Sequence, residues 1–250
     1  MPTQELSGTT ALVTGASRGF GRAIAVALSS RRAHVAGVAR DQGLLEELRA
    51  QLGDTFTPVA ADAADPEVAG HLLDKHLPRT LVLNAGAAPL PRPIHRQTWQ
   101  TFSRNWEVDV QHVFNWTREA LLLPLPPGSV VIAISSGAAV NGSPLSGGYA
   151  GAKATIQFIA SYAADESARN GLGTRFTSVL PQLTPETGLG AAGVAAYAAR
   201  QGVGIPAFLD RLGPALTPEQ VGTAIIDIVT GSADDRDAYL LTATGLSPVQ

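Results

Sequence analysis

The chain has 250 residues, of which 45% are hydrophobic and 16% charged, and its formal net charge is -3 at pH 7. This composition excludes a disordered chain, the length suits one α/β domain, and the charge gives no electrostatic basis for binding nucleic acid. Because the chain has no cysteine, it contains no disulfide, no thiolate nucleophile and no thiolate metal ligand.

The N-terminal segment has an acidic residue and no basic stretch before its first apolar run. No later apolar run approaches the length of a membrane span. We therefore expect a cytoplasmic protein without a membrane segment. The five histidines show no metal-ligand spacing, since His71 and His76 diverge on a helix, so no metal site is predicted.

Short β-like runs then alternate with longer helical stretches along the chain. Strands are expected at residues 10–15, 34–39, 55–62, 80–86, 129–136, 173–181 and 237–242. Helices are expected at 20–31, 41–53, 65–77, 98–123, from about 149 onward, and at 217–231. This alternation predicts a Rossmann-like α/β fold, in which a doubly wound, mostly parallel seven-stranded sheet carries helices on both faces. No linker or repeat divides the chain, so residues 1–250 are expected to form one domain.

The least regular region runs from Pro181 to Pro218 and is rich in Gly, Ala and Pro. Ligands of doubly wound sheets bind beyond the carboxyl ends of the strands, so a mobile segment after the sixth strand is predicted to cover a substrate. The alternative is that it only fills space in the packing.

The first strand ends in "TGASRGFG", residues 14–21. Gly15, Gly19 and Gly21 permit a tight turn, after which the start of a helix attracts a pyrophosphate through backbone N–H groups and the helix dipole. Ser17, Arg18 and Phe20 lie in the same turn and are candidate cofactor contacts. The spacing differs from the usual dinucleotide fingerprint, so alone this turn is also compatible with a structural role.

Arg40 follows the second strand, where a dinucleotide site commonly places an acidic residue for the ribose 2′-hydroxyl. An arginine would instead bind a 2′-phosphate, with Arg18 as a second positive group. NADP(H) is therefore expected to be preferred over NAD(H). The alternative is that Arg40 faces solvent.

Tyr149 and Lys153 stand four residues apart among Gly, Ala, Ser and Thr. On a helix this spacing places both side chains on one face. A neighbouring ammonium favours the phenolate form of a tyrosine, which can then give or take a proton near neutral pH.

These motifs, together with Asp62 after the third strand, "NAG" at 84–86 and "ISS" at 134–136, resemble the short, single-domain branch of the short-chain dehydrogenase/reductase family. The resemblance implies that Ser136, rather than Ser135, orients a substrate carbonyl beside Tyr149. It also implies that Lys153 holds the nicotinamide ribose and Asp62 the adenine, and that a homodimer or homotetramer forms. The remaining cofactor contacts that it implies are Asn84, Ala85, Gly86 and Pro181.

Three departures from the family pattern stand out. Asp109 occupies the usual place of an asparagine that holds a proton-relaying water, with His112 three residues later. The extra carboxylate would raise the pKa of the Lys153 ammonium. Gln182 replaces a usual glycine and is a candidate substrate contact, while Thr184 or Thr187 is expected at the nicotinamide amide. The C-terminal "LTATGLSPVQ" replaces a frequent glycine-rich end.

The sequence thus predicts an NADP(H)-dependent oxidoreductase that interconverts a ketone and a secondary alcohol, with Ser136, Tyr149, Lys153 and Asp109 at the catalytic centre. The apolar character of residues 181–218 favours an uncharged or lipophilic ketone. The alternatives are an NADP(H)-sensing regulatory protein without turnover and an epimerase or dehydratase, although the last usually has a longer substrate domain.

Overall fold

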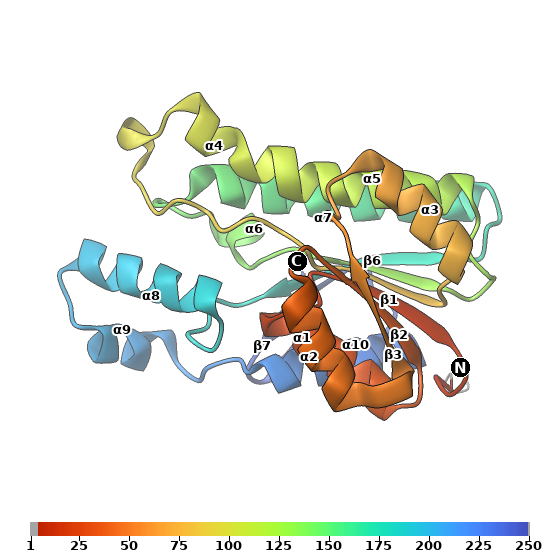
Figure 1. Ribbon diagram of the computed structural model, residues 1–250. Helices are drawn as coiled ribbons and strands as arrows, with labels where there is room; N and C mark the ends of the chain where they lie inside the picture. Colours follow the sequence, from red (N-terminus) through yellow and green to blue (C-terminus); the bar gives the residue numbers. More distant parts are fainter. Residues whose placement is uncertain (1–4, 250) are drawn as a thin grey trace.

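The computed structural model describes residues 5–249 and consists of one eight-stranded sheet with helices on both faces (Figure 1). The strands are β1 (Thr10–Thr14), β2 (His34–Ala39), β3 (Phe56–Ala60), β4 (Thr80–Leu83), β5 (Val130–Ile134), β6 (Arg175–Pro181), β7 (Ala238–Thr242) and β8 (Gly245–Pro248). The helices are α1 (Gly19–Ser30), α2 (Gln42–Leu52), α3 (Pro66–His76), α4 (Trp99–Asn105), α5 (Gln111–Leu122), α6 (Ala138–Asn141), α7 (Gly147–Arg169), α8 (Gly188–Gln201), α9 (Ile205–Leu212) and α10 (Pro218–Thr230).

The strand order is β3-β2-β1-β4-β5-β6-β7-β8, and every pair from β3 to β7 is parallel. The predicted α/β class is therefore confirmed. The chain reverses its direction of winding between β1 and β4, the point at which doubly wound sheets bind ligands.

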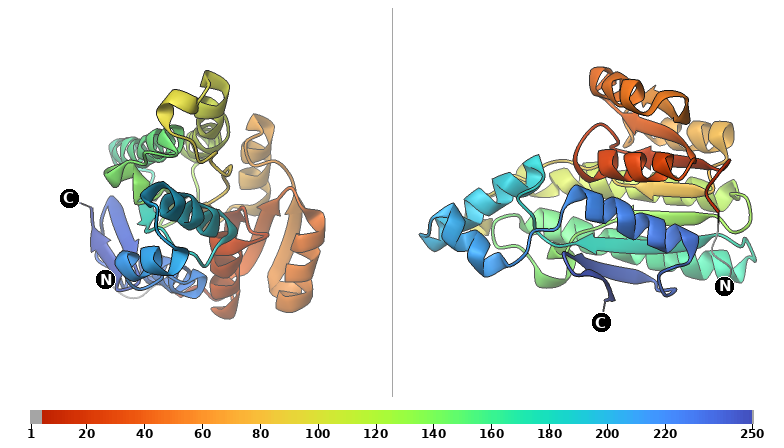
Figure 2. Two further views of the ribbon diagram at one scale, coloured as in Figure 1. Left: turned by 90° about the vertical axis from the view of Figure 1, so that its left-hand side faces the viewer. Right: turned by 90° about the horizontal axis from the view of Figure 1, so that it is seen from below.

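The sheet is buried on both faces because successive side chains of each strand point to opposite sides. In β5, Ile132 and Ile134 pack with α1 and α10, whereas Val131 and Ala133 pack with α3, α5 and α7. Figure 2 shows these two helical layers from the end and from below. The central strands consequently read as continuous apolar runs.

The prediction of seven strands is wrong by one, because β8 adds an antiparallel edge to β7. Thr242 pairs with Gly245, so two residues form the turn, and Gly245 adopts a φ of +113° that favours glycine. The strand is short, mostly exposed and contains Gly, Ser and Pro, so it lacks the apolar alternation that identifies a strand in a sequence.

The region from Pro181 to Pro218 is also more regular than expected, since it contains α8 and α9. Thr187 caps α8 by accepting a hydrogen bond from the Gly190 N–H, and the alanines that follow favour a helix. Gly202 ends α8 in the left-handed conformation. We call residues 188–212 the α8–α9 arm; Figure 1 shows it projecting beyond the sheet, opposite α4.

The long helix expected at 98–123 is α4 and α5 joined by a π-helical turn, Trp106–Val110, which contains Asp109. A π-helical turn inserts an extra residue and often marks a functional position. Among residues 5–249, no helix is both long and apolar enough to cross a membrane.

Candidate active site

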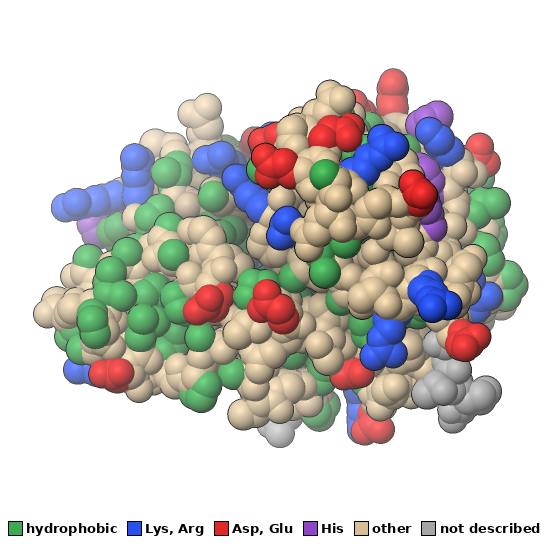
Figure 3. Space-filling model, turned by 60° about the horizontal axis from the view of Figure 1, so that its bottom comes forward, with side chains coloured by type: hydrophobic (Ala, Val, Ile, Leu, Met, Phe, Trp, Pro, Cys, Tyr) green, Lys and Arg blue, Asp and Glu red, His purple; other side chains and the backbone are tan. Residues whose placement is uncertain are grey.

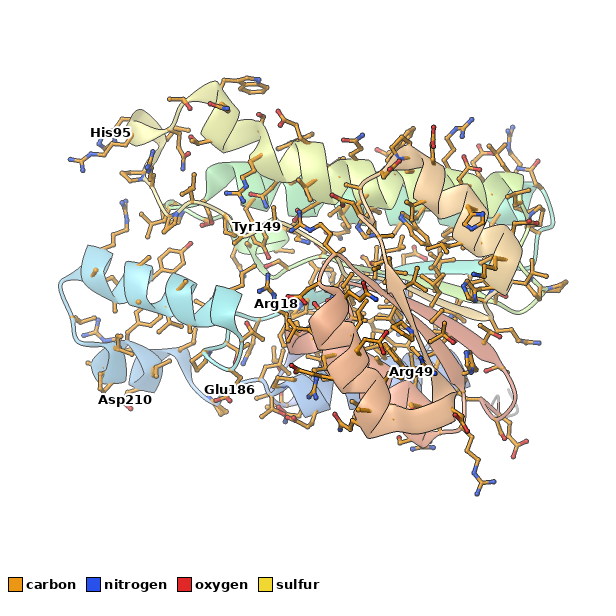
Figure 4. The ribbon with its side chains drawn as sticks, in the orientation of Figure 1. Arg18, Arg49, His95, Tyr149, Glu186 and Asp210 are labelled. Atoms are coloured by element: carbon orange, nitrogen blue, oxygen red, sulfur yellow. The ribbon has the colours of Figure 1, made fainter. Side chains whose placement is uncertain are left out.

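The predicted site residues follow the carboxyl ends of six neighbouring strands, β1 to β6, or lie on helix α7 and in the π-helical turn that contains Asp109. These carboxyl ends meet at one edge of the sheet because the strands are parallel. Figure 4 shows Tyr149 and Arg18 at this edge, near the start of the α8–α9 arm.

The glycine turn brings α1 against the ends of β1 and β4. A Cβ on Gly21 would lie 2.2 Å from the Gly15 carbonyl oxygen and 2.5 Å from Asn84 Nδ2, so this approach requires glycine. Arg18, at the N-cap of α1, caps no backbone group with its side chain, and the first turn contains no acidic residue. The N–H groups at the start of α1 therefore suit the phosphates of a dinucleotide.

Asn84 holds the end of β4 against the glycine turn. Its Nδ2 donates to the carbonyls of Thr14 at 3.1 Å and Gly15 at 3.3 Å. The backbone N–H groups of Asn84 and Ala85 both donate to the Thr14 hydroxyl. The predicted support of a cofactor by Asn84, Ala85 and Gly86 is thus compatible with their position beside this turn.

Arg40 directly follows β2, and Asp62 lies just after β3. Their side chains form a long ion pair, with Arg40 Nη1 3.9 Å from Asp62 Oδ2. Their side chains are 76% and 54% exposed, so both groups are accessible to a ligand. Asp62 also accepts a hydrogen bond from the Ala64 N–H at 3.0 Å, which makes it a turn former as well.

The two serines after β5 have different environments. The buried Ser135 hydroxyl donates to the Lys153 carbonyl at 2.7 Å and so fixes α7 to the sheet. Ser136 is partly exposed, and its Oγ accepts only the Ala138 N–H, at 3.2 Å, among the contacts of the described residues. Ser136 is therefore the more accessible of the two hydroxyls, and its contact with a substrate carbonyl stays a prediction.

Lys153 is buried beneath Tyr149. Its Nζ lies 5.5 Å from the centre of the Tyr149 ring, donates to the Ile134 carbonyl at 3.1 Å and forms an ion pair with Asp109 Oδ2 at 3.3 Å. Burial alone would lower the pKa of Lys153, but the Asp109 carboxylate and, next, Tyr149 outweigh it and raise that pKa. The ammonium is therefore charged at neutral pH.

Asp109 is completely buried, so its carboxylate does not face solvent. Its Oδ1 accepts a hydrogen bond from the Ala87 N–H at 2.7 Å, and a Cβ on Gly86 would lie 2.9 Å from Oδ2. The carboxylate thus packs against the segment after β4 and reaches Lys153 directly.

Asn105, one turn before Asp109, donates to the Ala87 carbonyl at 2.8 Å and was not expected at the site. Residues four positions apart lie on one face of a helix, so its spacing from Asp109 is the sequence signal that could have identified Asn105.

His112 is buried beside this pair. Neither ring nitrogen has a hydrogen-bond partner within residues 5–249. The ring packs edge-on against Trp116, with the two ring centres 6.2 Å apart. Burial, followed by the charge of Lys153, lowers the pKa of His112 to about 3. It is therefore a neutral imidazole at physiological pH.

The residues after β6 connect the sheet to the α8–α9 arm and to α10. Gln182 Nε2 donates to the Pro214 carbonyl at 2.8 Å, and the buried Thr184 hydroxyl donates to the Leu216 carbonyl at 2.7 Å. Thr187 lies over the glycine turn, because a Cβ on Gly19 would be 3.7 Å from its methyl group. Pro181 accepts the Gly137 N–H at 2.9 Å, next to Ser136.

The position of this site follows from its chemistry and not from cavity size. A cavity of about 480 Å³ lies elsewhere, between α10 and the β7–β8 hairpin, and includes none of the predicted site residues. Among residues 5–249, no cluster of His, Asp and Glu side chains is suited to hold a metal ion.

Comparison with known proteins identifies similar reductases over part of the chain. The hamster (Mesocricetus auratus) L-xylulose reductase is 32% identical over 129 residues, covering 50% of this chain and 52% of the relative. A probable NADP-dependent dehydrogenase of Haemophilus influenzae is 34% identical over 147 residues, covering 56% and 55%. An NADPH-dependent pterin aldehyde reductase of Arabidopsis thaliana is 29% identical over 165 residues, covering 63% and 68%. The first two alignments span about half the length of each relative.

The fold is shared with a solved 3-ketoacyl-(acyl-carrier-protein) reductase from Brucella melitensis, crystallised with NADH. The TM-score is 0.78 at 22% identity, over 95% of this chain and 98% of that one. The family model for short chain dehydrogenases matches residues 9–197, which include the glycine turn, Ser136, Tyr149 and Lys153. The chain therefore belongs to the short-chain dehydrogenase family.

Proposed function

We propose that this protein is an NADP(H)-dependent oxidoreductase that interconverts a small ketone and its secondary alcohol. The observation that supports this most strongly is the charged Lys153 Nζ, 5.5 Å from the ring centre of the partly exposed Tyr149. An ammonium held against a phenol favours proton transfer by that phenol.

The site residues have separate roles in this proposal. Tyr149 donates its proton to the carbonyl oxygen during reduction and accepts it during oxidation. Ser136 donates a hydrogen bond to the same oxygen and stabilises the developing negative charge. Lys153 keeps a positive charge beside Tyr149, and Asp109 fixes that ammonium through the buried ion pair at 3.3 Å. The nicotinamide dinucleotide, when bound, supplies the hydride in reduction.

Residues of the glycine turn, from Gly15 to Gly21, would hold the dinucleotide phosphates, and Asp62 would contact the adenine. Arg40, with Arg18, favours a 2′-phosphate and hence NADP(H) over NAD(H). Names of relatives such as the NADPH-dependent pterin aldehyde reductase support this preference, whereas the solved structural neighbour contains NADH. We place Thr187, rather than the occupied hydroxyl of Thr184, beside the nicotinamide.

The proposal also includes a cover over the substrate, an oligomeric state and a location in the cell. The α8–α9 arm would cover the substrate. Exposed aromatic side chains on α5 and α7, Phe114 at 52% and Phe158 at 57%, support a homodimer or homotetramer. We also propose a cytoplasmic location.

The test is NADPH oxidation at about 340 nm, the absorbance of a reduced nicotinamide, across a panel of ketones and aldehydes. We expect turnover that prefers NADPH over NADH and that falls by about 10²–10⁴-fold in Tyr149→Phe. Tight NADPH binding without Tyr149-dependent turnover on the whole panel would refute the enzyme proposal and favour the NADP(H)-sensing alternative.

A further inference from the structure

The α8–α9 arm has a small apolar core of its own, formed by Val194, Ala198 and Phe208. The Tyr197 ring stacks on Phe208, with ring centres 6.3 Å apart and planes within 6°. Figure 3 shows hydrophobic side chains gathered over this part of the surface, where Leu189 and Ile205 are 44% and 47% exposed. The arm therefore presents an apolar surface, as expected for a lipophilic substrate.

A polar feature interrupts that surface beside the catalytic residues. The hydroxyl of Tyr197 is hydrogen-bonded to Ser143 Oγ, which lies 2.5 Å from Ser146 Oγ and accepts the Ser146 N–H at 3.1 Å. We call Ser143, Ser146 and Tyr197 the hydroxyl cluster. All three residues are partly exposed, so a ligand can reach them.

The hydroxyl cluster has unused hydrogen-bonding capacity. A hydroxyl has one donor and two acceptor positions, so the three contacts of Ser143 Oγ saturate it. Tyr197 and Ser146 each use one position within the cluster, and each retains positions for a further partner. An apolar ligand surface alone would leave these positions without a partner, at a cost in binding.

The hydroxyl cluster includes the N-cap of the helix that carries the catalytic tyrosine. Ser146 is the N-cap of α7, and Tyr149 lies three residues later in the first turn. Three residues of an α-helix rise about 4.5 Å, which is close to the span of the three or four bonds between the two oxygen atoms of a hydroxy ketone. A group bonded to Tyr197 and Ser146 would therefore be a near neighbour of a carbonyl bonded to Tyr149.

We propose that Tyr197 and Ser146 determine specificity by binding a hydroxyl group one to three carbons from the reacting carbonyl. The preferred substrate class is thus a hydroxy ketone with an apolar or aromatic body, rather than an unsubstituted lipophilic ketone. This inference rests on the proposed function, because it assigns the carbonyl to Tyr149.

The test uses ketones in matched pairs, with and without the hydroxyl. Suitable pairs are 2-hydroxycyclohexanone with cyclohexanone, and 2-hydroxyacetophenone with acetophenone. The readout is kcat/KM of the hydroxy ketone divided by kcat/KM of its unsubstituted partner. This ratio does not depend on the fraction of active protein, so it is unaffected by partial misfolding of a variant. We expect Tyr197→Phe and Ser146→Ala each to lower this ratio by about 3- to 10-fold, the loss of one hydrogen bond.

Tyr162→Phe is the matched control, because Tyr162 is 62% exposed on α7 and stacks only on Phe158 among the described rings. Its ratio should equal that of the wild type. Ratios that stay within about twofold of the wild type in both Tyr197→Phe and Ser146→Ala would overturn the inference.

A binding measurement separates this inference from the proposed function. Calorimetric titration of the NADP⁺ complex of Tyr149→Phe with 1,2-cyclohexanediol, and with cyclohexanol for comparison, needs no turnover. We expect tighter binding of the diol and loss of that advantage when Tyr197→Phe is added. If no ketone is reduced but this pattern holds, the proposed function fails and the hydroxyl subsite stands. Equal binding of the diol and the alcohol refutes the subsite.

Discussion

Replacing Asp109 with asparagine removes the charge that faces Lys153 while keeping the size of the side chain. The amide oxygen can still accept the Ala87 N–H, which is 2.7 Å from Oδ1 in the structure. Lys153 Nζ would then keep the Ile134 carbonyl as a hydrogen-bond acceptor but lose its buried counterion. The substitution therefore tests the charge of Asp109 separately from its shape.

The expected loss of stability follows from the ion-pair distance. At 3.3 Å and an effective dielectric constant of about 20, the attraction is about 5 kcal/mol. Asparagine avoids part of the cost of burying a carboxylate, so we expect a net loss of about 2–4 kcal/mol. For a domain of this size, each kcal/mol changes Tm by about 2–4 °C, which predicts a decrease of about 4–16 °C.

Thermal unfolding followed by circular dichroism measures this change, and NMR of the Lys153 Cε measures its titration. The pKa of Lys153 should fall in Asp109→Asn, because burial continues to lower it and the main opposing charge is gone. Asp235→Asn is the control, since Asp235 pairs with Arg175 at 2.8 Å but is 63% exposed, and it should cost less than about 1 kcal/mol. An unchanged Tm together with an unchanged Lys153 titration in Asp109→Asn would refute the role that we give to the ion pair.

Three further predictions follow from the site. Arg40→Ala should raise the Kd of NADPH about 10-fold or more while changing that of NADH little, because one charge-assisted contact is lost; equal effects on both cofactors in calorimetric titrations would contradict it. His112→Leu should make the protein less sensitive to acid. The folded wild type keeps His112 neutral down to a pKa of about 3, whereas the unfolded chain takes up the proton below about pH 6.5, so stability is lost as the pH falls. Denaturant unfolding should show about 2–3 kcal/mol less loss in His112→Leu than in the wild type between pH 6.5 and 4.5, and the same slope in both proteins would count against a neutral buried imidazole. Gly21→Ala should abolish dinucleotide binding, since its Cβ would lie 2.2 Å from the Gly15 carbonyl oxygen; normal NADPH affinity would show that the turn adapts.

Much of the fold could be predicted from the sequence because buried parallel strands are continuous apolar runs and their helices carry an apolar stripe. The second strand, expected at 34–39, matches β2 residue for residue. β8 was missed because an exposed edge strand of four residues has no such run. The helices of the α8–α9 arm were missed because Gly and Pro within 181–218 were interpreted as breaks, whereas they end α8 and begin α9.

Part of the site could be predicted from the sequence because the strand order and the helical spacing determine where some of its residues lie. Residues at strand ends, such as Asn84 and Ser136, have positions that the strand order determines, and the α7 pair has a spacing that places both side chains together. That the Asp109 charge lies near Lys153 was expected from the family resemblance, but their direct ion pair at 3.3 Å depends on the π-helical turn at Trp106–Val110, which no sequence pattern predicted. The Tyr197–Ser143 bond joins residues 54 positions apart on separate elements, so no local pattern indicates it.

The most direct test of the proposed function is transfer of deuterium from NADPH labelled at C4 of the nicotinamide, on both faces, to a ketone. The alcohol formed from the ketone panel is analysed by mass spectrometry. We predict one deuterium on the carbinol carbon with the wild-type protein, and at least about 100-fold less labelled alcohol with Tyr149→Phe in the same time. Absence of labelled alcohol from every ketone, or equal labelling with both proteins, would contradict hydride transfer assisted by Tyr149.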